Sequence, residues 1–216
     1  MIQGLKVCGI KDIATLKYLI NHSYRPKFIG FITNYKKSKR FVDLKSLRIL
    51  TSLNRGDIKF VSVLVNPDDK ILENIKNLKF EYYQLYDTTP SRTLYIKKKY
   101  KVKIISALTI EKIDDVMKYK NYKKVSDIIL FDGKGYEKSI AFDHNLLKKV
   151  EKSITKMVAG NIKKSDIPNI KLKCYIDVSG SLEIKKGIKS KKKINLFLNY
   201  LNKYENKKRH TINRST

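Results

Sequence analysis

The sequence predicts an α/β protein built as a single eight-stranded parallel βα barrel, the TIM-barrel architecture. Eight short apolar runs, rich in β-branched side chains, recur about every 20 to 30 residues, which is the size of one βα unit. Amphipathic helical patterns fill several of the intervals between them. The chain has 216 residues, a length at which βα barrels fold as one domain.

The predicted strands are apolar nearly throughout, as expected for a parallel sheet covered on both faces. In chain order they are Leu5–Gly9, Phe28–Ile32, Phe60–Val65, Tyr82–Tyr86, Val102–Ala107, Asp127–Phe131, Met157–Gly160 and Cys174–Val178. Eight such units imply closure, and an open doubly wound sheet is the alternative. The Gly-x-Gly-x-x-Gly turn typical of that alternative is missing after the first strand, where Gly9 stands alone.

Apolar residues spaced by three, four and seven predict helices between the strands, each with one buried face. The first three helices and the last one are predicted from Ile13, Leu16, Leu19 and Ile20; Leu44, Leu47, Leu50 and Leu53; Ile71, Ile75 and Leu78; and Ile194, Leu196, Phe197, Tyr200 and Leu201. The seventh crossover is thin, because Pro168 interrupts residues 163–168 after one or two turns. The barrel domain is predicted over residues 1–206, followed by a basic, disordered tail, 207–216.

The net charge of +28 is compatible with a nucleic-acid-binding protein. However, only seven of the 48 basic residues are arginine, whereas base recognition and bidentate phosphate contacts favour arginine. The best aromatic stacking candidates are Tyr82, Tyr83 and Tyr86. Alternation along the strand places Tyr82 and Tyr86 on the same side as Gln84, inside or atop a barrel. Most lysines are therefore interpreted as solvated helix faces.

The two cysteines are too few for a disulfide framework and lack the spacing of a zinc site, so neither a metal nor a cofactor is expected. A strand that begins at residue 5 leaves no room for a signal peptide. No apolar stretch approaches the length of a membrane span. These observations predict a soluble, cytoplasmic protein without a membrane or nucleic-acid partner; a monomer and a homodimer are equally compatible.

Active sites of βα barrels lie at the carboxyl ends of the strands, so the residues that close each run are the candidates. The thiol of Cys8 ends the first strand, Arg40 follows the second, and Asp132 ends the sixth. Each residue also has an interpretation without a functional role. Cys8 would be a small buried thiol, Arg40 an exposed basic loop residue, and Asp132 part of an Asp-Gly turn. Further candidates at the same edge are Gln84, Gly160, Asn161, Ser179, Gly180 and Ser181.

The order and spacing of these blocks resemble the phosphoribosylanthranilate isomerase family over nearly the whole chain. The blocks that carry the resemblance are Lys6–Ile10, Ile29–Ile32, Lys37–Phe41, Val61–Asn66, Gln84–Leu85, Leu130–Asp132, Phe142–Asp143, Val158–Asn161 and Asp177–Glu183. The resemblance implies an isomerase of tryptophan biosynthesis that converts N-(5-phosphoribosyl)anthranilate to 1-(2-carboxyphenylamino)-1-deoxyribulose 5-phosphate by an Amadori rearrangement.

The resemblance also implies roles for the candidates. Asp132 would be the general acid and Cys8 the general base, and Arg40 would hold the anthranilate carboxylate in a bidentate way. The phosphate would sit on the backbone of Gly160 and Asn161 and of Ser179, Gly180 and Ser181. Gln84 is a substrate contact or a satisfied core amide. A positive mouth would help form the Cys8 thiolate.

Three departures from the family pattern accompany the resemblance. The glycine-rich loop after the sixth strand is shorter here, at residues 133–140, which puts closure over the substrate in doubt. Tyr86-Asp87 stands where the family prefers His-Gly, and Gly160 is a single glycine where two are typical. A catalytically degenerate barrel and a basic nucleic-acid-binding protein are therefore the alternatives. A phosphosugar isomerase of histidine synthesis would need carboxylates on strands one and five, which the sequence lacks.

Overall fold

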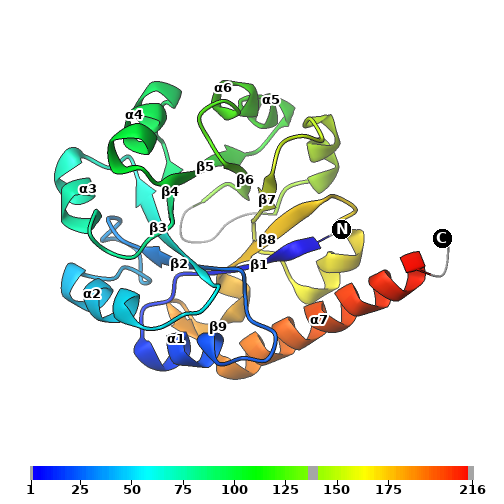
Figure 1. The fold of residues 1–216 in the computed structure, drawn as a ribbon. Helices are drawn as coiled ribbons and strands as arrows, with labels where there is room; N and C mark the ends of the chain where they lie inside the picture. Colours follow the sequence, from blue (N-terminus) through cyan, green and yellow to red (C-terminus); the bar gives the residue numbers. More distant parts are fainter. Residues whose placement is uncertain (1, 136–140, 214–216) are drawn as a thin grey trace.

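The computed structural model describes residues 2–135 and 141–213 and forms one closed barrel of eight parallel strands, in the order β1 to β8 around the barrel (Figure 1). The predicted fold class is confirmed. The strands are β1 Ile2–Cys8, β2 Phe28–Ile32, β3 Lys59–Val65, β4 Tyr82–Tyr86, β5 Lys103–Ile110, β6 Ile128–Gly133, β7 Lys156–Val158 and β8 Cys174–Val178. Closure is made by β1, whose residues Leu5, Lys6 and Val7 pair with β8.

Within the described residues, six α-helices and three 3-10 helices surround the strands, and a long helix follows them. They are α1 Ile13–Ile20, α2 Leu44–Ser52, α3 Asp69–Ile75, α4 Pro90–Tyr100, α5 Ile113–Met117, α6 Tyr119–Tyr122, η1 His144–Lys149, η2 Lys164–Asn169, η3 Gly180–Leu182 and α7 Lys191–Asn213. The thin seventh crossover is η2, with Pro168 inside it. Leu78, predicted in the third helix, lies beyond the end of α3 and packs against the core.

The first helices begin where a short polar side chain caps the backbone. Asp12, Asp43 and Asp68 each accept a hydrogen bond from the backbone N–H three residues ahead, at 2.7, 2.9 and 2.8 Å. Thr89 does the same for α4. Such caps satisfy donors that the first helical turn leaves unpaired. They fix how each helix leaves the carboxyl edge of the barrel.

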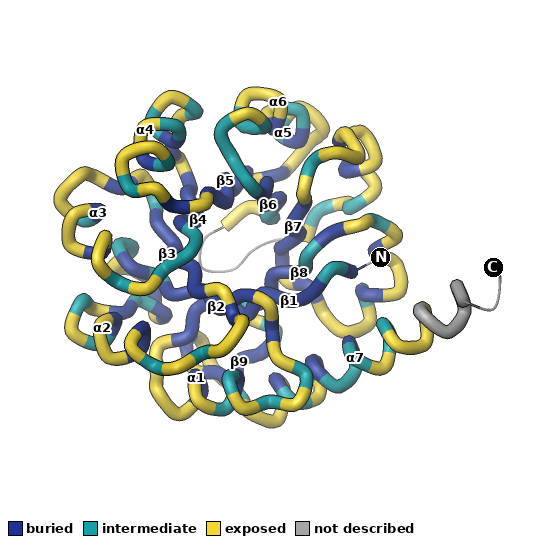
Figure 2. The backbone as a smooth tube through the Cα atoms, viewed as in Figure 1, coloured by how far each residue is buried: buried dark blue, intermediate teal, exposed yellow. Residues whose placement is uncertain are grey.

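The buried residues form two layers, one inside the barrel and one between the strands and the helices (Figure 2). The inner layer includes Phe28, Val61, Ile105, Leu130 and Met157. Tyr82 packs against Phe28 in this layer, with ring centroids 5.4 Å apart. The inward direction predicted for Tyr82 is therefore confirmed, and its ring is not a surface platform for stacked bases.

Helix α7 continues through Lys207 and Lys208 to Asn213, so the predicted tail begins inside a helix. Contacts between successive turns continue to Lys208, and the disorder of residues 207–216 stays a prediction. Asn206 donates to Asn202 at 3.1 Å, and the Lys208 ammonium lies 5.3 Å from the centroid of the Tyr204 ring. Within the described part of the chain, no helix combines the length and the apolar composition that crossing a bilayer requires.

A short hairpin, β9 Glu183–Lys185 with β10 Ile188–Lys189, follows β8 and was not predicted. Gly187 turns it with a φ of +82°, and a Cβ on this residue would lie 2.5 Å from the carbonyl oxygen of Lys39. Only glycine fits such a close approach. The hairpin is thereby seated against the loop that follows β2, directly beside Arg40.

Candidate active site

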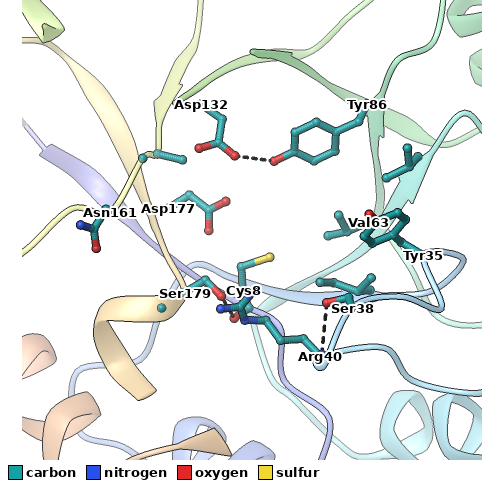
Figure 3. Close-up of a pocket in the computed structure, with 15 residues that line it drawn as sticks. Cys8, Tyr35, Ser38, Arg40, Val63, Tyr86, Asp132, Asn161, Asp177 and Ser179 are labelled. Atoms are coloured by element: carbon teal, nitrogen blue, oxygen red, sulfur yellow. Dashed lines mark hydrogen bonds between the residues drawn. The ribbon is translucent and has the colours of Figure 1, made fainter. Parts of the chain in front are cut away.

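A cavity of about 280 Å³ opens at the carboxyl ends of the strands. Figure 3 shows its wall, to which strands from all around the barrel contribute. Of the nine predicted site residues, seven line it: Cys8, Arg40, Asp132, Gly160, Asn161, Ser179 and Gly180. The cavity thus brings together predicted residues that are far apart in the sequence.

Cys8 ends β1 and is buried, with 8% of its surface exposed. Burial raises the pKa of its thiol above the ordinary value of 9.0, although the nearby Lys6 ammonium opposes this shift. The pKa of Cys8 is raised overall. A positive charge, that of Lys6, does favour the thiolate as expected, but it does not outweigh burial. The thiol form predominates at neutral pH, and the thiolate fraction increases as the pH rises.

Lys6 lies beneath Cys8 with none of its surface exposed, and its ammonium donates to Asp177 Oδ2 at 2.8 Å. Burial alone would lower the pKa of Lys6, but the Asp177 carboxylate and Cys8 raise it above 10.5. The lysine therefore stays charged. Gly30 on the next strand makes room for this group, because a Cβ there would lie 2.9 Å from Cys8 Sγ and 3.1 Å from Lys6 Nζ.

Asp132 lies near the end of β6 and accepts a hydrogen bond from the Tyr86 hydroxyl at 2.8 Å (Figure 3). Gln84, two residues before Tyr86 on β4, donates its amide to the same hydroxyl at 3.2 Å. Gln84 is fully buried and does not line the cavity. Of its two predicted readings, burial favours the core amide, although its Oε1 is not paired within the described residues. Its assignment as a substrate contact stays a prediction.

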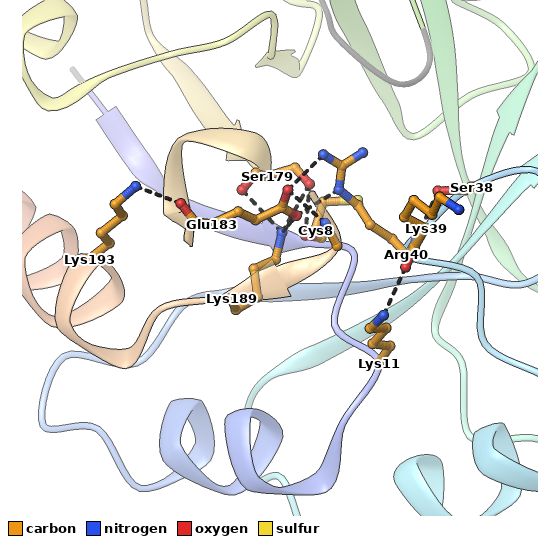
Figure 4. Close-up of polar contacts among 10 residues, drawn as sticks. Cys8, Lys11, Ser38, Lys39, Arg40, Ser179, Glu183, Lys189 and Lys193 are labelled. Carbon is orange, nitrogen blue, oxygen red and sulfur yellow. Dashed lines mark hydrogen bonds and ion pairs between the residues drawn. The ribbon is translucent and has the colours of Figure 1, made fainter. Parts of the chain in front are cut away.

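Arg40 is buried and held by Glu183 of the β9 hairpin (Figure 4). Its Nε and Nη2 donate to the two carboxylate oxygens at 2.7 and 2.9 Å. Lys189 donates to the same carboxylate at 2.7 Å and to the Ser179 carbonyl oxygen at 3.1 Å. Burial raises the pKa of Glu183, but Arg40 and Lys189 outweigh it and bring the value to about 2. The reading of Arg40 as an exposed loop residue is wrong.

The turns after β7 and β8 have the backbone expected of an anion site. Gly160 and Asn161 both have positive φ, +99° and +55°, which is why β7 ends at Val158, earlier than predicted. Ser179 lines the cavity and donates its hydroxyl to the Cys8 carbonyl oxygen at 3.1 Å. The hydroxyl of Ser181 is buried and Ser181 does not line the cavity, so a contact from this residue stays a prediction for its backbone N–H.

The other part of the wall is apolar and lies next to Arg40. Ile32, Val63 and Val65 contribute aliphatic side chains, and Tyr35 contributes its ring. An apolar wall beside a guanidinium suits a flat aromatic ring that carries an anionic substituent. Among the described residues, no three His, Cys, Asp or Glu side chains gather closely enough to hold a metal ion. The shortened loop predicted after the sixth strand includes residues 136–140, which lie outside the described residues.

Sequence reasoning missed four side chains that shape the site. Lys6, Glu183 and Lys189 act from behind the cavity wall, whereas Asp177, interpreted from the sequence as a loop-fixing residue, lines it. Lys6 and Glu183 stand inside the blocks that carry the family resemblance. A lysine in the middle of an apolar strand was the one available signal, because a buried lysine needs a partner.

Comparison with known proteins gives a consistent result. Residues 5–200 match the family model described as N-(5'phosphoribosyl)anthranilate (PRA) isomerase. A protein of Agrobacterium fabrum named N-(5'-phosphoribosyl)anthranilate isomerase is 27% identical over 214 residues, covering 94% of this chain and 96% of its own. One of the same name from Rhizobium etli is 29% identical over 202 residues, covering 88% and 90%.

Solved structures show the same fold. The phosphoribosyl anthranilate isomerase of Thermotoga maritima superposes with a TM-score of 0.80 at 22% identity, covering 93% of this chain and 98% of its own. A phosphoribosyl anthranilate isomerase in complex with reduced 1-(o-carboxyphenylamino)-1-deoxyribulose 5-phosphate gives a TM-score of 0.77 at 20% identity, covering 92% and 97%.

Proposed function

The chain belongs to the N-(5'-phosphoribosyl)anthranilate isomerase family, and we propose that it catalyses the Amadori rearrangement of tryptophan biosynthesis with Asp132 as general acid and Cys8 as general base. The observation that carries this proposal is the placement of the two groups. They lie on β6 and β1, which are not neighbours in the barrel, and both line one cavity (Figure 3). An acid and a base on separate walls can act on two different atoms of one bound substrate.

The first two steps of the reaction each move one proton. Asp132 donates a proton to the ring oxygen of the ribose, and the ring C1–O bond breaks to leave an iminium ion. The Cys8 thiolate then removes the proton from C2, and the electron pair of that C–H bond forms the double bond of an enolamine. The enolamine tautomerises to the ketone. Aldose and ketose have the same composition, so no oxidant and no cofactor is required.

Lys6 supports the base electrostatically. A thiolate buried at the end of β1 would be costly without a nearby positive charge. The Lys6 ammonium is such a charge, because it stays protonated beside Asp177 and Cys8. The thiolate form of the proposed base is thus stabilised by one buried ammonium rather than by the diffuse positive charge of the surface.

The two anionic ends of the substrate would find separate partners in the cavity. The phosphate would bind to backbone N–H groups of the turns formed by Gly160 and Asn161 and by Ser179, Gly180 and Ser181. The anthranilate ring would lie on the apolar wall with its carboxylate at Arg40. Glu183 already occupies the Nε–Nη2 edge of Arg40, so the carboxylate would approach another edge of the guanidinium.

The test is the loss of anthranilate fluorescence when the purified protein is mixed with freshly generated phosphoribosylanthranilate. The wild type is expected to consume the substrate. Arg40→Ala is expected to raise KM by roughly 10- to 100-fold, because it removes a charge-assisted contact to the carboxylate, with a smaller effect on kcat. A wild type that leaves the fluorescence unchanged would refute the function. An Arg40→Ala variant with normal KM would refute the carboxylate contact.

The net charge of +28 leads to a second prediction. A substrate with a phosphate and a carboxylate is attracted to such a protein, and salt screens that attraction. We expect kcat/KM to fall about tenfold between roughly 0.01 and 1 M KCl, with kcat nearly constant. A flat salt dependence would show that the lysines are solvated surface residues without a role in substrate capture.

The proposed partner is therefore a small phosphorylated sugar derivative. A biosynthetic role of this kind fits the cytoplasm, and either a monomer or a homodimer would accommodate a site that one barrel supplies in full. The single barrel domain is proposed to include α7, since this helix packs on η2 and η3.

A further inference from the structure

Tyr86 is a buried phenol in direct contact with the proposed general acid. It closes β4, lines the cavity, and has 9% of its surface exposed. Its hydroxyl lies between two partners, receiving a hydrogen bond from Gln84 at 3.2 Å and donating one to Asp132 at 2.8 Å. The three side chains come from one strand and its second neighbour, so the barrel itself sets their spacing.

The two hydrogen bonds run in one direction in the structure. The Gln84 amide nitrogen can only donate, so the phenol accepts from it and turns its own proton toward the carboxyl. Burial, and then the Asp132 carboxyl, raise the pKa of Tyr86 well above 10. The phenol is therefore a donor throughout the pH range in which an enzyme operates.

We propose that Tyr86 is a positioning residue for Asp132, which orients the carboxyl toward the substrate and stabilises the carboxylate that forms when Asp132 gives up its proton. This inference rests on the proposed role of Asp132 as general acid. It assigns a task to a residue at which the sequence departs from the family pattern of His-Gly.

The physical basis is a hydrogen bond that strengthens during the reaction. A phenol bonds more strongly to a carboxylate than to a neutral carboxylic acid. As the proton moves from Asp132 to the ring oxygen, negative charge develops on the carboxyl, and the Tyr86 O–H already points at it. A donor that is in place before the charge appears lowers the barrier without a cost of reorganisation.

Other ionisable groups surround this pair in the described part of the chain. Cys8 and Asp177 line the cavity on one side. A second hollow beside Asp132 and Tyr86 is lined by Asp87 and Lys134. All four groups stay in place when only the phenol oxygen is removed, so a change in the titration of Asp132 in that variant reports the loss of the hydrogen bond.

The experiment compares Tyr86→Phe with Tyr83→Phe in the fluorescence assay across pH, with the thermal midpoint of each variant measured alongside. Tyr83 lies on the same strand and is equally buried, but it packs in the outer cluster against Ile104 and Tyr100 rather than in the cavity. Tyr86→Phe is expected to lower kcat about tenfold, the loss of one hydrogen bond to a charged group. KM should change less than twofold, and the pH limb set by Asp132 should move to higher pH.

The outcomes separate this inference from the proposed function. An unchanged kcat in Tyr86→Phe would overturn the inference, as would a lower kcat with an unmoved pH profile or an equal loss in Tyr83→Phe. In each of these cases an inactive Asp132→Asn would leave the acid assignment intact. Full activity in Asp132→Asn would instead refute the acid assignment and the role of Tyr86 with it.

Discussion

Cys8→Ala and Asp132→Asn are each expected to lower kcat by roughly 10²- to 10⁴-fold, the usual loss when a general acid or base is removed. Cys8→Ala removes the group that would take the C2 proton, and Asp132→Asn leaves an amide that cannot protonate the ring oxygen. Both side chains line the same cavity. The loss should appear in kcat more than in KM, because each group acts on the reacting atoms in the transition state.

Cys174→Ala is the matched control for the thiol. Cys174 is the other cysteine, fully buried, at the beginning of β8 and therefore at the opposite end of the barrel. The control should keep the wild-type kcat. If Cys8→Ala and Asp132→Asn both turned over normally, the acid–base mechanism would be wrong even though the fold is right.

Glu183→Gln is expected to destabilise the protein by about 3 to 5 kcal/mol, because it leaves two buried cations without their counter-charge. Arg40 and Lys189 both bind this carboxylate, and all three side chains are at most 7% exposed. The pKa of Glu183 is lowered to about 2 in the folded protein. Its contribution to stability is therefore complete above the unfolded-state pKa of 4.5 and is lost as the pH falls toward 2.

Urea unfolding at several pH values measures this contribution. Glu73→Gln is the control, since the pKa of Glu73 is also lowered to about 2 but its partners, Lys76 and Lys99, lie on the surface. We expect little change in the Glu73→Gln midpoint, because exposed ion pairs add little. Equal effects of the two substitutions would mean that burial of the Arg40–Glu183–Lys189 cluster does not matter.

The sequence was sufficient for the barrel because its signals are local. Five-residue apolar runs such as Phe28–Ile32 and the spacing of Leu16 and Leu19 need no tertiary information to be read. The boundaries that the sequence did not specify depend on single backbone angles or on packing. The early end of β7 follows from the positive φ at Gly160, and the reach of α7 depends on contacts between its own later turns.

The sequence predicted the site residues that lie at strand ends and missed the residues that are placed there by ion pairs. Cys8, Arg40 and Asp132 follow from their positions at the carboxyl edge, but the partner of Arg40 is 143 residues away in a hairpin that no periodicity marks. Lys6 is one of many lysines, and its burial becomes visible only when β1 and β8 pair. The hydrogen bond from Tyr86 to Asp132 likewise joins two strands that are not adjacent in the sheet.

The two buried ion pairs also bear on how the protein is made. Lys6 and Arg40 belong to the first fifth of the chain, whereas Asp177 and Glu183 belong to the last. A nascent chain leaves the ribosome with its amino end first, so both cations must wait until β8 and the hairpin after it have been synthesised. Until β8 and its hairpin emerge, the early strands cannot close around these charges. Assembly of the catalytic pocket and closure of the barrel are consequently one late event in biogenesis.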